Sequence, residues 1–134
     1  MIPLKIGDYI ELVVLALSNN NISDDNLAEL GSLANLQTLN LGKNSLEGEM
    51  TSQLRKLNQL IYLNFMANKL QGSILEELNE LSKLVLLVLS GDQLSGPLSG
   101  KLCQNSSKLE HLLLSTNNFT GEILVRLMSC QSMK

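Results

Sequence analysis

A leucine-rich motif returns about every 24 residues along this chain of 134 residues and constrains its fold more than any other feature. The motif is Leu-x-x-Leu-x-Leu-x-x-Asn-x-Leu, with minor substitutions, in five consecutive turns. The turns begin at Leu12, Leu36, Leu60, Leu84 and Leu109. A fixed period of this length predicts a solenoid, in which each turn buries its apolar edge against its neighbours. A solenoid offers a long surface and no catalytic pocket of its own, so the motif favours a binding protein.

The repeat phase divides the whole chain into turns. We expect a partial turn over 1–11, full turns over 12–35, 36–59, 60–83, 84–108 and 109–132, and the start of another turn at 133–134. The fourth turn has one extra residue, which we place in a loop within 101–108. Solenoids need terminal caps with a polar outer face, and the sequence shows none. We therefore expect a segment of a longer solenoid, with a short protein that has frayed ends as the alternative.

The alternating Leu-x-Leu stretch of each turn predicts a short strand. Strands of successive turns stack in parallel, and the residues between the leucines point out of the concave face. Apolar pairs three residues apart, such as Leu54 and Leu57, predict a 3₁₀ or short helical segment on the convex side. The predicted fold class is an α/β solenoid with a parallel sheet on the concave face and 3₁₀ helices, short helices or loops on the convex side.

A polar column follows the strands. It consists of Asn20, Asn44, Asn68, Asp92 and Asn117. A buried Asn both donates and accepts hydrogen bonds, so it can satisfy backbone groups of its own bend and of the neighbouring turn. Asp92 cannot donate unless it is protonated, and its charge is costly to bury. The fourth turn is therefore predicted to be a weak point.

Composition excludes several classes of function. The net charge of −3 gives no basic surface for nucleic acid, and 3% aromatic residues are too few for base stacking. No apolar run is long enough to span a bilayer, and the first residues lack the basic and apolar parts of a signal peptide. We expect this segment to contact neither nucleic acid nor membrane.

Catalytic chemistry finds no support. The single histidine, His111, is expected to point outward from a strand, where a surface contact is a simpler role than that of a base without a partner. No phosphate loop, kinase motif or metal-ligand set occurs. We expect no enzyme activity, no cofactor and no metal, and any kinase domain of a parent protein lies outside this chain.

The outward strand residues form the candidate ligand-binding surface. They are Thr38, Asn40, Tyr62, Asn64, Met66, Leu86, Val88, His111 and Leu113. We expect Leu86, Val88 and Leu113 to be exposed as an apolar shelf, and the amides of Asn40 and Asn64 to be free for a peptide backbone. An exposed apolar patch framed by polar residues marks a binding site. The alternative is that the ligand site lies on other turns.

Two further features bear on the cellular compartment. Cys103 and Cys130 lie 27 residues apart, about one turn, so they can sit on adjacent turns. Cys130 also fits an apolar slot as a simple buried thiol. Glycosylation sequons begin at Asn21, Asn105 and Asn118 and are compatible with secretion.

The complete repeat, L-x-x-L-x-L-x-x-N-x-L-x-G-x-I, resembles the plant-specific class of leucine-rich repeat. The stretch 68–74 (NKLQGSI) is a clear example. That class forms the ectodomains of receptor-like kinases and receptor-like proteins, and the polygalacturonase inhibitors. The stretches 102–109, 121–123 and 130–134 also resemble GASSHO-type receptor kinases, which bind secreted sulfated peptides and recruit smaller co-receptor kinases.

The resemblance implies a protein- or peptide-recognition segment of a plant extracellular receptor, on the apoplastic side of the plasma membrane within a longer parent. A secreted peptide or protein is the implied ligand, and a co-receptor kinase ectodomain the second partner. The resemblance also favours the Cys103–Cys130 disulfide. Two other functions stay open: an enzyme inhibitor of the polygalacturonase-inhibitor kind, which would need cysteine-bearing caps, and a structural spacer within an ectodomain.

Overall fold

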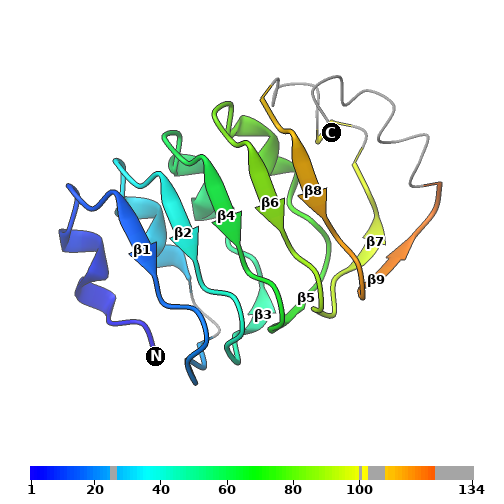
Figure 1. Ribbon diagram of the computed structural model, residues 1–134, viewed down its shortest axis with the longest axis horizontal. Helices are drawn as coiled ribbons and strands as arrows, with labels where there is room; N and C mark the ends of the chain where they lie inside the picture. The colour runs from blue at the N-terminus through cyan, green and yellow to red at the C-terminus, as the bar shows by residue number, and fades with distance from the viewer. Residues whose placement is uncertain (25–26, 100, 103–107, 123–134) are drawn as a thin grey trace.

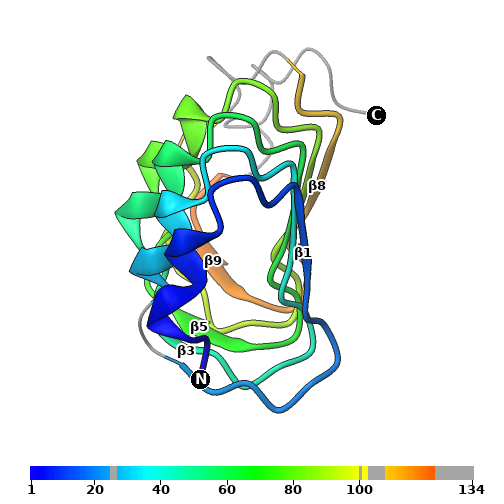
Figure 2. The same ribbon diagram turned by 90° about the vertical axis from the view of Figure 1, so that its left-hand side faces the viewer.

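The chain winds into a solenoid whose turns stack side by side (Figure 1). The computed structural model describes residues 1–24, 27–99, 101–102 and 108–122. Seen along the stack, the strands of the main sheet lie on one side and the 3₁₀ helices on the other (Figure 2). The predicted α/β solenoid is confirmed.

Among the described residues, five short strands form a parallel sheet in chain order. They are β1 (Val14–Ala16), β2 (Thr38–Asn40), β4 (Tyr62–Asn64), β6 (Leu86–Val88) and β8 (His111–Leu113). The central residue of every strand is a leucine, paired in register with the leucine of the next strand. Because successive side chains of a strand point to opposite faces, the inward leucines turn the residues on either side of them outward.

In the described part of the chain, four 3₁₀ helices lie on the opposite side, as the apolar pairs predicted. They are η1 (Leu4–Asp8), η2 (Ala28–Ser32), η3 (Ser52–Lys56) and η4 (Glu76–Glu80). No helix in the described ranges is long and apolar enough to cross a membrane. The helices fill the convex side one turn at a time, so they follow the same period as the strands.

Two small parallel sheets were not predicted. β3 (Glu47–Glu49) pairs with β5 (Lys69–Gln71), and β7 (Ser95–Pro97) pairs with β9 (Asn118–Thr120). Each pair joins adjacent turns between the main sheet and the convex side (Figure 2). A glycine with positive φ lies within or directly after each of these strands: Gly48, Gly72, Gly96 and Gly121. This backbone conformation favours glycine and explains the glycine column of the repeat.

The leucine columns form one continuous core. Leu36, Leu60 and Leu63 have no exposed surface, and Phe65 fills a leucine position of the third turn while remaining fully buried. In the first full turn, Leu12 is only partly buried, because fewer turns cover it. Burial of each turn therefore depends on its neighbours, as a solenoid requires.

The asparagine column joins consecutive turns through backbone groups. Asn68 donates through Nδ2 to the carbonyl of Phe65 in its own turn at 2.7 Å and to that of Leu41 in the preceding turn at 3.1 Å. Its Oδ1 accepts the N–H of Leu46 at 3.0 Å. Asn44 and Asn117 make the same three types of bond. Asn20, the first predicted member of the column, is exposed and donates only to the carbonyls of Leu17 and Ser18 in its own bend. The ladder between turns is thus formed by the three later asparagines, whose amides bond backbone groups that lie outside the strands.

Asp92 occupies the ladder position of the fourth turn and makes only part of this pattern. Its Oδ1 accepts the N–H of Leu70 at 3.0 Å, as the asparagines do one turn earlier and later. Its Oδ2 then takes the place of the amide nitrogen, is buried, and has no hydrogen-bond partner in the described part of the chain. Burial raises the pKa of the Asp92 carboxyl from 3.8 to about 6, although the N–H groups of Leu70 and Asn68 lower it in part.

The substitution Asp92→Asn restores the missing donor. We expect it to raise the free energy of unfolding by about 1–2 kcal/mol near neutral pH. The folded-state pKa of about 6 lies above the ordinary value of 3.8, so the cost of the carboxylate is present above pH 6. This cost declines as the pH falls towards 3.8, and the gain from the substitution shrinks with it.

Urea titrations at about pH 7.5 and pH 4 measure this gain. The reciprocal variant Asn68→Asp is the control, because it places the same carboxylate one turn earlier. This variant should have a lower free energy of unfolding than the unchanged chain at the higher pH, and most of that loss should disappear at the lower pH. A gain for Asp92→Asn that does not change with pH would contradict the buried carboxylate.

Gly31 marks a close approach between η2 and η3. A Cβ at this position would lie 2.7 Å from the carbonyl oxygen of Gln53 and 2.8 Å from its Cβ. A Cβ on Gly7, at the same position of the preceding turn, would lie 3.2 Å from the Cβ of Ser32. We expect Gly31→Ala to lower the free energy of unfolding by about 2–3 kcal/mol through overpacking, and Gly7→Ala to cost less than half as much. Chemical unfolding followed by circular dichroism compares the two, and equal losses would contradict this account.

Candidate functional site

The outward residues of the five strands, with one further residue just beyond each strand, form three rows, which together we call the sheet face. The register brings Val14, Thr38, Tyr62, Leu86 and His111 into the first row, and Ala16, Asn40, Asn64, Val88 and Leu113 into the second. Backbone hydrogen bonds just beyond the strands align the third row, Ser18, Gly42, Met66, Ser90 and Ser115. Every residue predicted to bind ligand therefore lies in one of these rows.

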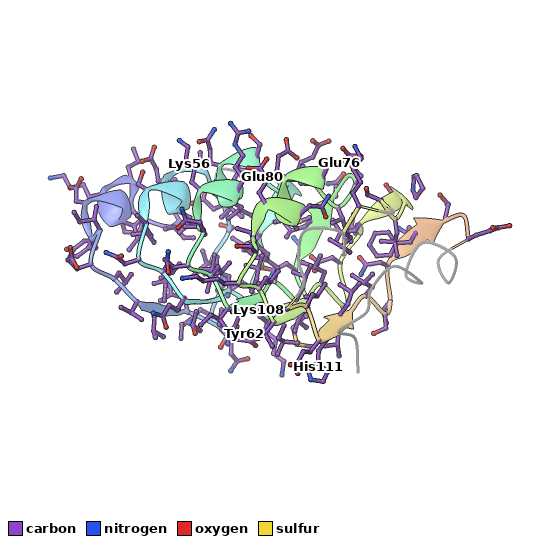
Figure 3. The ribbon with its side chains drawn as sticks, turned by 90° about the horizontal axis from the view of Figure 1, so that it is seen from above. Lys56, Tyr62, Glu76, Glu80, Lys108 and His111 are labelled. Atoms are coloured by element: carbon purple, nitrogen blue, oxygen red, sulfur yellow. The ribbon has the colours of Figure 1, made fainter. Side chains whose placement is uncertain are left out.

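The sheet face and the convex side differ in charge. Tyr62 and His111 project from the strand side, whereas Lys56, Glu76 and Glu80 project from the helix side (Figure 3). The three rows of the sheet face contain no Asp, Glu, Lys or Arg. The sheet face thus presents hydrogen-bonding and apolar groups and no acidic side chain, lysine or arginine that could form an ion pair.

The apolar shelf is narrower than predicted. Leu113 is 47% exposed, as expected, and Leu86 is half-buried, but Val88 is only 8% exposed. Val88 lies between Asn64 and Leu113 in the second row. The expectation that Val88 is exposed was therefore wrong, and Leu113 and Leu86 are the apolar contacts that remain.

Asn64 is buried and both ends of its amide are already bonded. Its Oδ1 accepts the backbone N–H of Met66 at 2.8 Å, and its Nδ2 donates to the hydroxyl oxygen of Tyr62 at 2.9 Å. The side chain is 7% exposed. The expectation that this amide is free for a peptide backbone was wrong, because the amide is held between two groups of its own turn.

Asn40 shows half of the same arrangement one turn earlier. Its Oδ1 accepts the N–H of Gly42 at 3.2 Å, while its Nδ2 makes no hydrogen bond with any described residue. Asn40 is half-buried, so its Nδ2 remains a candidate donor for a ligand. A side chain that bonds the N–H two residues later is a known tendency of Asn. Asn40 and Asn64 lie 24 residues apart, and each bonds the N–H of the residue two positions later. This recurrence of Asn is the sequence signal from which the local bond could have been predicted.

The remaining predicted sites lie away from the sheet face or outside the described residues. Asn21 and Asn118 are exposed at the surface. Cys103, Cys130 and Asn105 lie outside the described residues, as does the middle of the predicted loop within 101–108. Among the described residues, no group of three or more His, Cys, Asp and Glu side chains is arranged to hold a metal ion.

The repeats define a leucine-rich repeat protein. The sequence matches the family described as Leucine Rich Repeat at residues 11–33, 35–57 and 108–130. These segments make up just over half of the chain. The chain belongs to the leucine-rich repeat family.

Solved plant receptor ectodomains share this fold closely. The plant peptide hormone receptor RGFR1 in complex with RGF2 is 35% identical with a TM-score of 0.93 over 99% of this chain. The ectodomain of the receptor kinase GASSHO1/SCHENGEN3 from Arabidopsis thaliana, in complex with CASPARIAN STRIP INTEGRITY FACTOR 2, is 28% identical with a TM-score of 0.92 over 99% of this chain. The Arabidopsis receptor kinase HAESA, in complex with the peptide hormone IDA and the co-receptor SERK1, is 33% identical with a TM-score of 0.90 over 97%.

The chain spans only part of these receptors. It covers 21% of the RGFR1 chain, 16% of the GASSHO1/SCHENGEN3 chain and 22% of the HAESA chain. No curated protein sequence matches the chain. The predicted resemblance to plant leucine-rich repeat receptor ectodomains is confirmed at the level of fold and repeat class.

Proposed function

We propose that this chain is a recognition segment of a plant extracellular receptor and that its sheet face binds an extended peptide. The observation that carries the proposal is the combination of an exposed Leu113, a half-buried Leu86 and a polar Tyr62 on adjacent parallel strands. Stacked strands repeat these outward positions about every 4.8 Å. A peptide that crosses the turns can therefore contact several strands without any movement of the backbone.

The similar receptors support the direction of this proposal. Their structures contain a peptide hormone or a named factor, and the HAESA complex also contains a co-receptor. By analogy, a secreted peptide or protein is the ligand of this chain, and a co-receptor ectodomain is its second partner. The segment acts on the extracellular side of the plasma membrane within a longer parent. It contributes recognition and not catalysis, since any kinase domain of that parent lies outside these residues.

The test uses the 134-residue chain and dodecamer peptides selected on it from a random phage-displayed library. We expect selected peptides to depend on the sheet face. Leu113→Glu should weaken their binding at least tenfold, because it places a charge on the apolar shelf. Leu4→Glu is the matched control, since Leu4 is also an exposed leucine but lies on η1. Fluorescence anisotropy of labelled peptides measures both.

Two results would count against this function. If peptides bind Leu113→Glu as tightly as the unchanged chain, the ligand site lies elsewhere. If no selected peptide distinguishes Leu113→Glu from Leu4→Glu, the sheet face is not a peptide site and a spacer role is favoured.

A further inference from the structure

The orientation of the Asn64 amide follows from its neighbours. A backbone N–H can only donate, so the Asn64 atom 2.8 Å from the nitrogen of Met66 must be the acceptor Oδ1. The other end of the amide is therefore Nδ2, which carries two donor hydrogens and cannot accept. Gly42 leaves room for this arrangement, because a Cβ there would lie 3.1 Å from both Nδ2 and Oδ1 of Asn64.

This orientation determines how the hydroxyl of Tyr62 is used. Nδ2 of Asn64 lies 2.9 Å from the hydroxyl oxygen and must donate to it. The hydroxyl oxygen is then the acceptor of that bond, and its own hydrogen is left over. Tyr62 makes no second hydrogen bond with a described residue. Since Tyr62 is half-buried in the first row and projects from the strand side (Figure 3), this hydrogen is available to a bound molecule.

The preceding turn lacks this hydrogen-bond arrangement. Thr38 and Asn40 occupy the same two rows on β2, and Asn40 makes the equivalent bond to a backbone N–H. No hydrogen bond joins Asn40 to the side chain of Thr38, which is too short to match the reach of a tyrosine. The chain from backbone N–H through amide to hydroxyl therefore belongs to β4, at the centre of the sheet.

We propose that Asn64 holds the Tyr62 hydroxyl as an outward hydrogen-bond donor, and that the peptide bound by the sheet face presents an oxygen acceptor to it. This inference rests on the proposed function. The acceptor is a main-chain carbonyl or a carboxylate. The three rows of the sheet face contain no Lys or Arg that would compete with Tyr62 for this oxygen. β8 lies two strands from β4, about 10 Å away, which an extended peptide spans in about three residues. The ligand thus carries an acceptor oxygen about three residues from an apolar side chain that contacts Leu113.

Two substitutions remove the outward donor without a large change in side-chain size. Tyr62→Phe removes the hydroxyl. Asn64→Asp keeps Oδ1 but replaces Nδ2 by an acceptor oxygen, so that the tyrosine hydrogen turns inward to the carboxylate. We expect each variant of the 134-residue chain to bind the selected dodecamers about 5–20-fold more weakly, which corresponds to one hydrogen bond. The double variant should bind the dodecamers with no lower affinity than the single variant that binds them more weakly, because both changes remove the same donor.

The peptide provides an independent readout. Each carbonyl of a selected dodecamer is replaced in turn by a thioamide, each Asp or Glu by Asn or Gln, and the C-terminal acid by an amide. One of these replacements should weaken binding to the unchanged chain and have little further effect on Tyr62→Phe. The replacement that does so shows whether the acceptor is a carbonyl or a carboxylate. Circular dichroism melts confirm folding, and Tyr62→Phe with the peptide series is sufficient if Asn64→Asp does not fold.

The failure of this inference differs from the failure of the proposed function. Loss of binding with Leu113→Glu but full binding with Tyr62→Phe would keep the sheet face as the site and overturn the donor role of Tyr62. If the losses of affinity from Tyr62→Phe and Asn64→Asp multiply in the double variant, the link between Asn64 and Tyr62 is overturned. Unchanged binding with Leu113→Glu would overturn the peptide site itself, and the acceptor with it.

Discussion

The amide of the ladder asparagine is the interaction on which the rest of this structure depends. Short strands leave the backbone groups of the following bend without partners, and a buried unpaired group costs about 1–3 kcal/mol. One asparagine supplies both kinds of group at once: Nδ2 of Asn68 reaches carbonyls of two turns, and Oδ1 takes an N–H of the earlier turn. Because the same amide bonds both turns, it also sets the register between them.

That register is what turns a repeated sequence into a usable surface. Leucines inside the solenoid repeat with little variation, so the strands stack in line and their outward residues fall into straight rows. The outward residues contribute less to this stacking, although Asn64 and Val88 among them are buried, and they differ between turns. Threonine, tyrosine, leucine and histidine follow one another in a single row from β2 to β8 for this reason. The inward side of each strand thus maintains the fold, and the outward side carries the chemistry of the proposed recognition surface.

The sequence predicts features that burial and period determine, and misses those that depend on single contacts between side chains. Leucine columns, strands, the ladder and the glycine positions follow from a period of 24 residues. Positive φ at Lys43 and Ala67, just before the ladder, goes against the preference of both residue types, and only Asn19 and Gly91 at the same position of other turns indicate it. The burial of Val88 and Asn64 could not be foreseen either, because a position in a row gives the direction of a side chain but not how its neighbours cover it.

Asn64 shows why this second kind of feature matters for recognition. By its row it is an outward polar residue, equivalent to Asn40, and nothing in its spacing distinguishes the two. A tyrosine two residues earlier changes its role, because the amide then has a hydroxyl within reach as well as a backbone N–H. In the proposed complex, the residue that contacts the ligand is Tyr62, and Asn64 determines which way its hydrogen points. In a solenoid whose backbone is the same in every turn, differences in binding chemistry arise from such pairs of side chains within one turn.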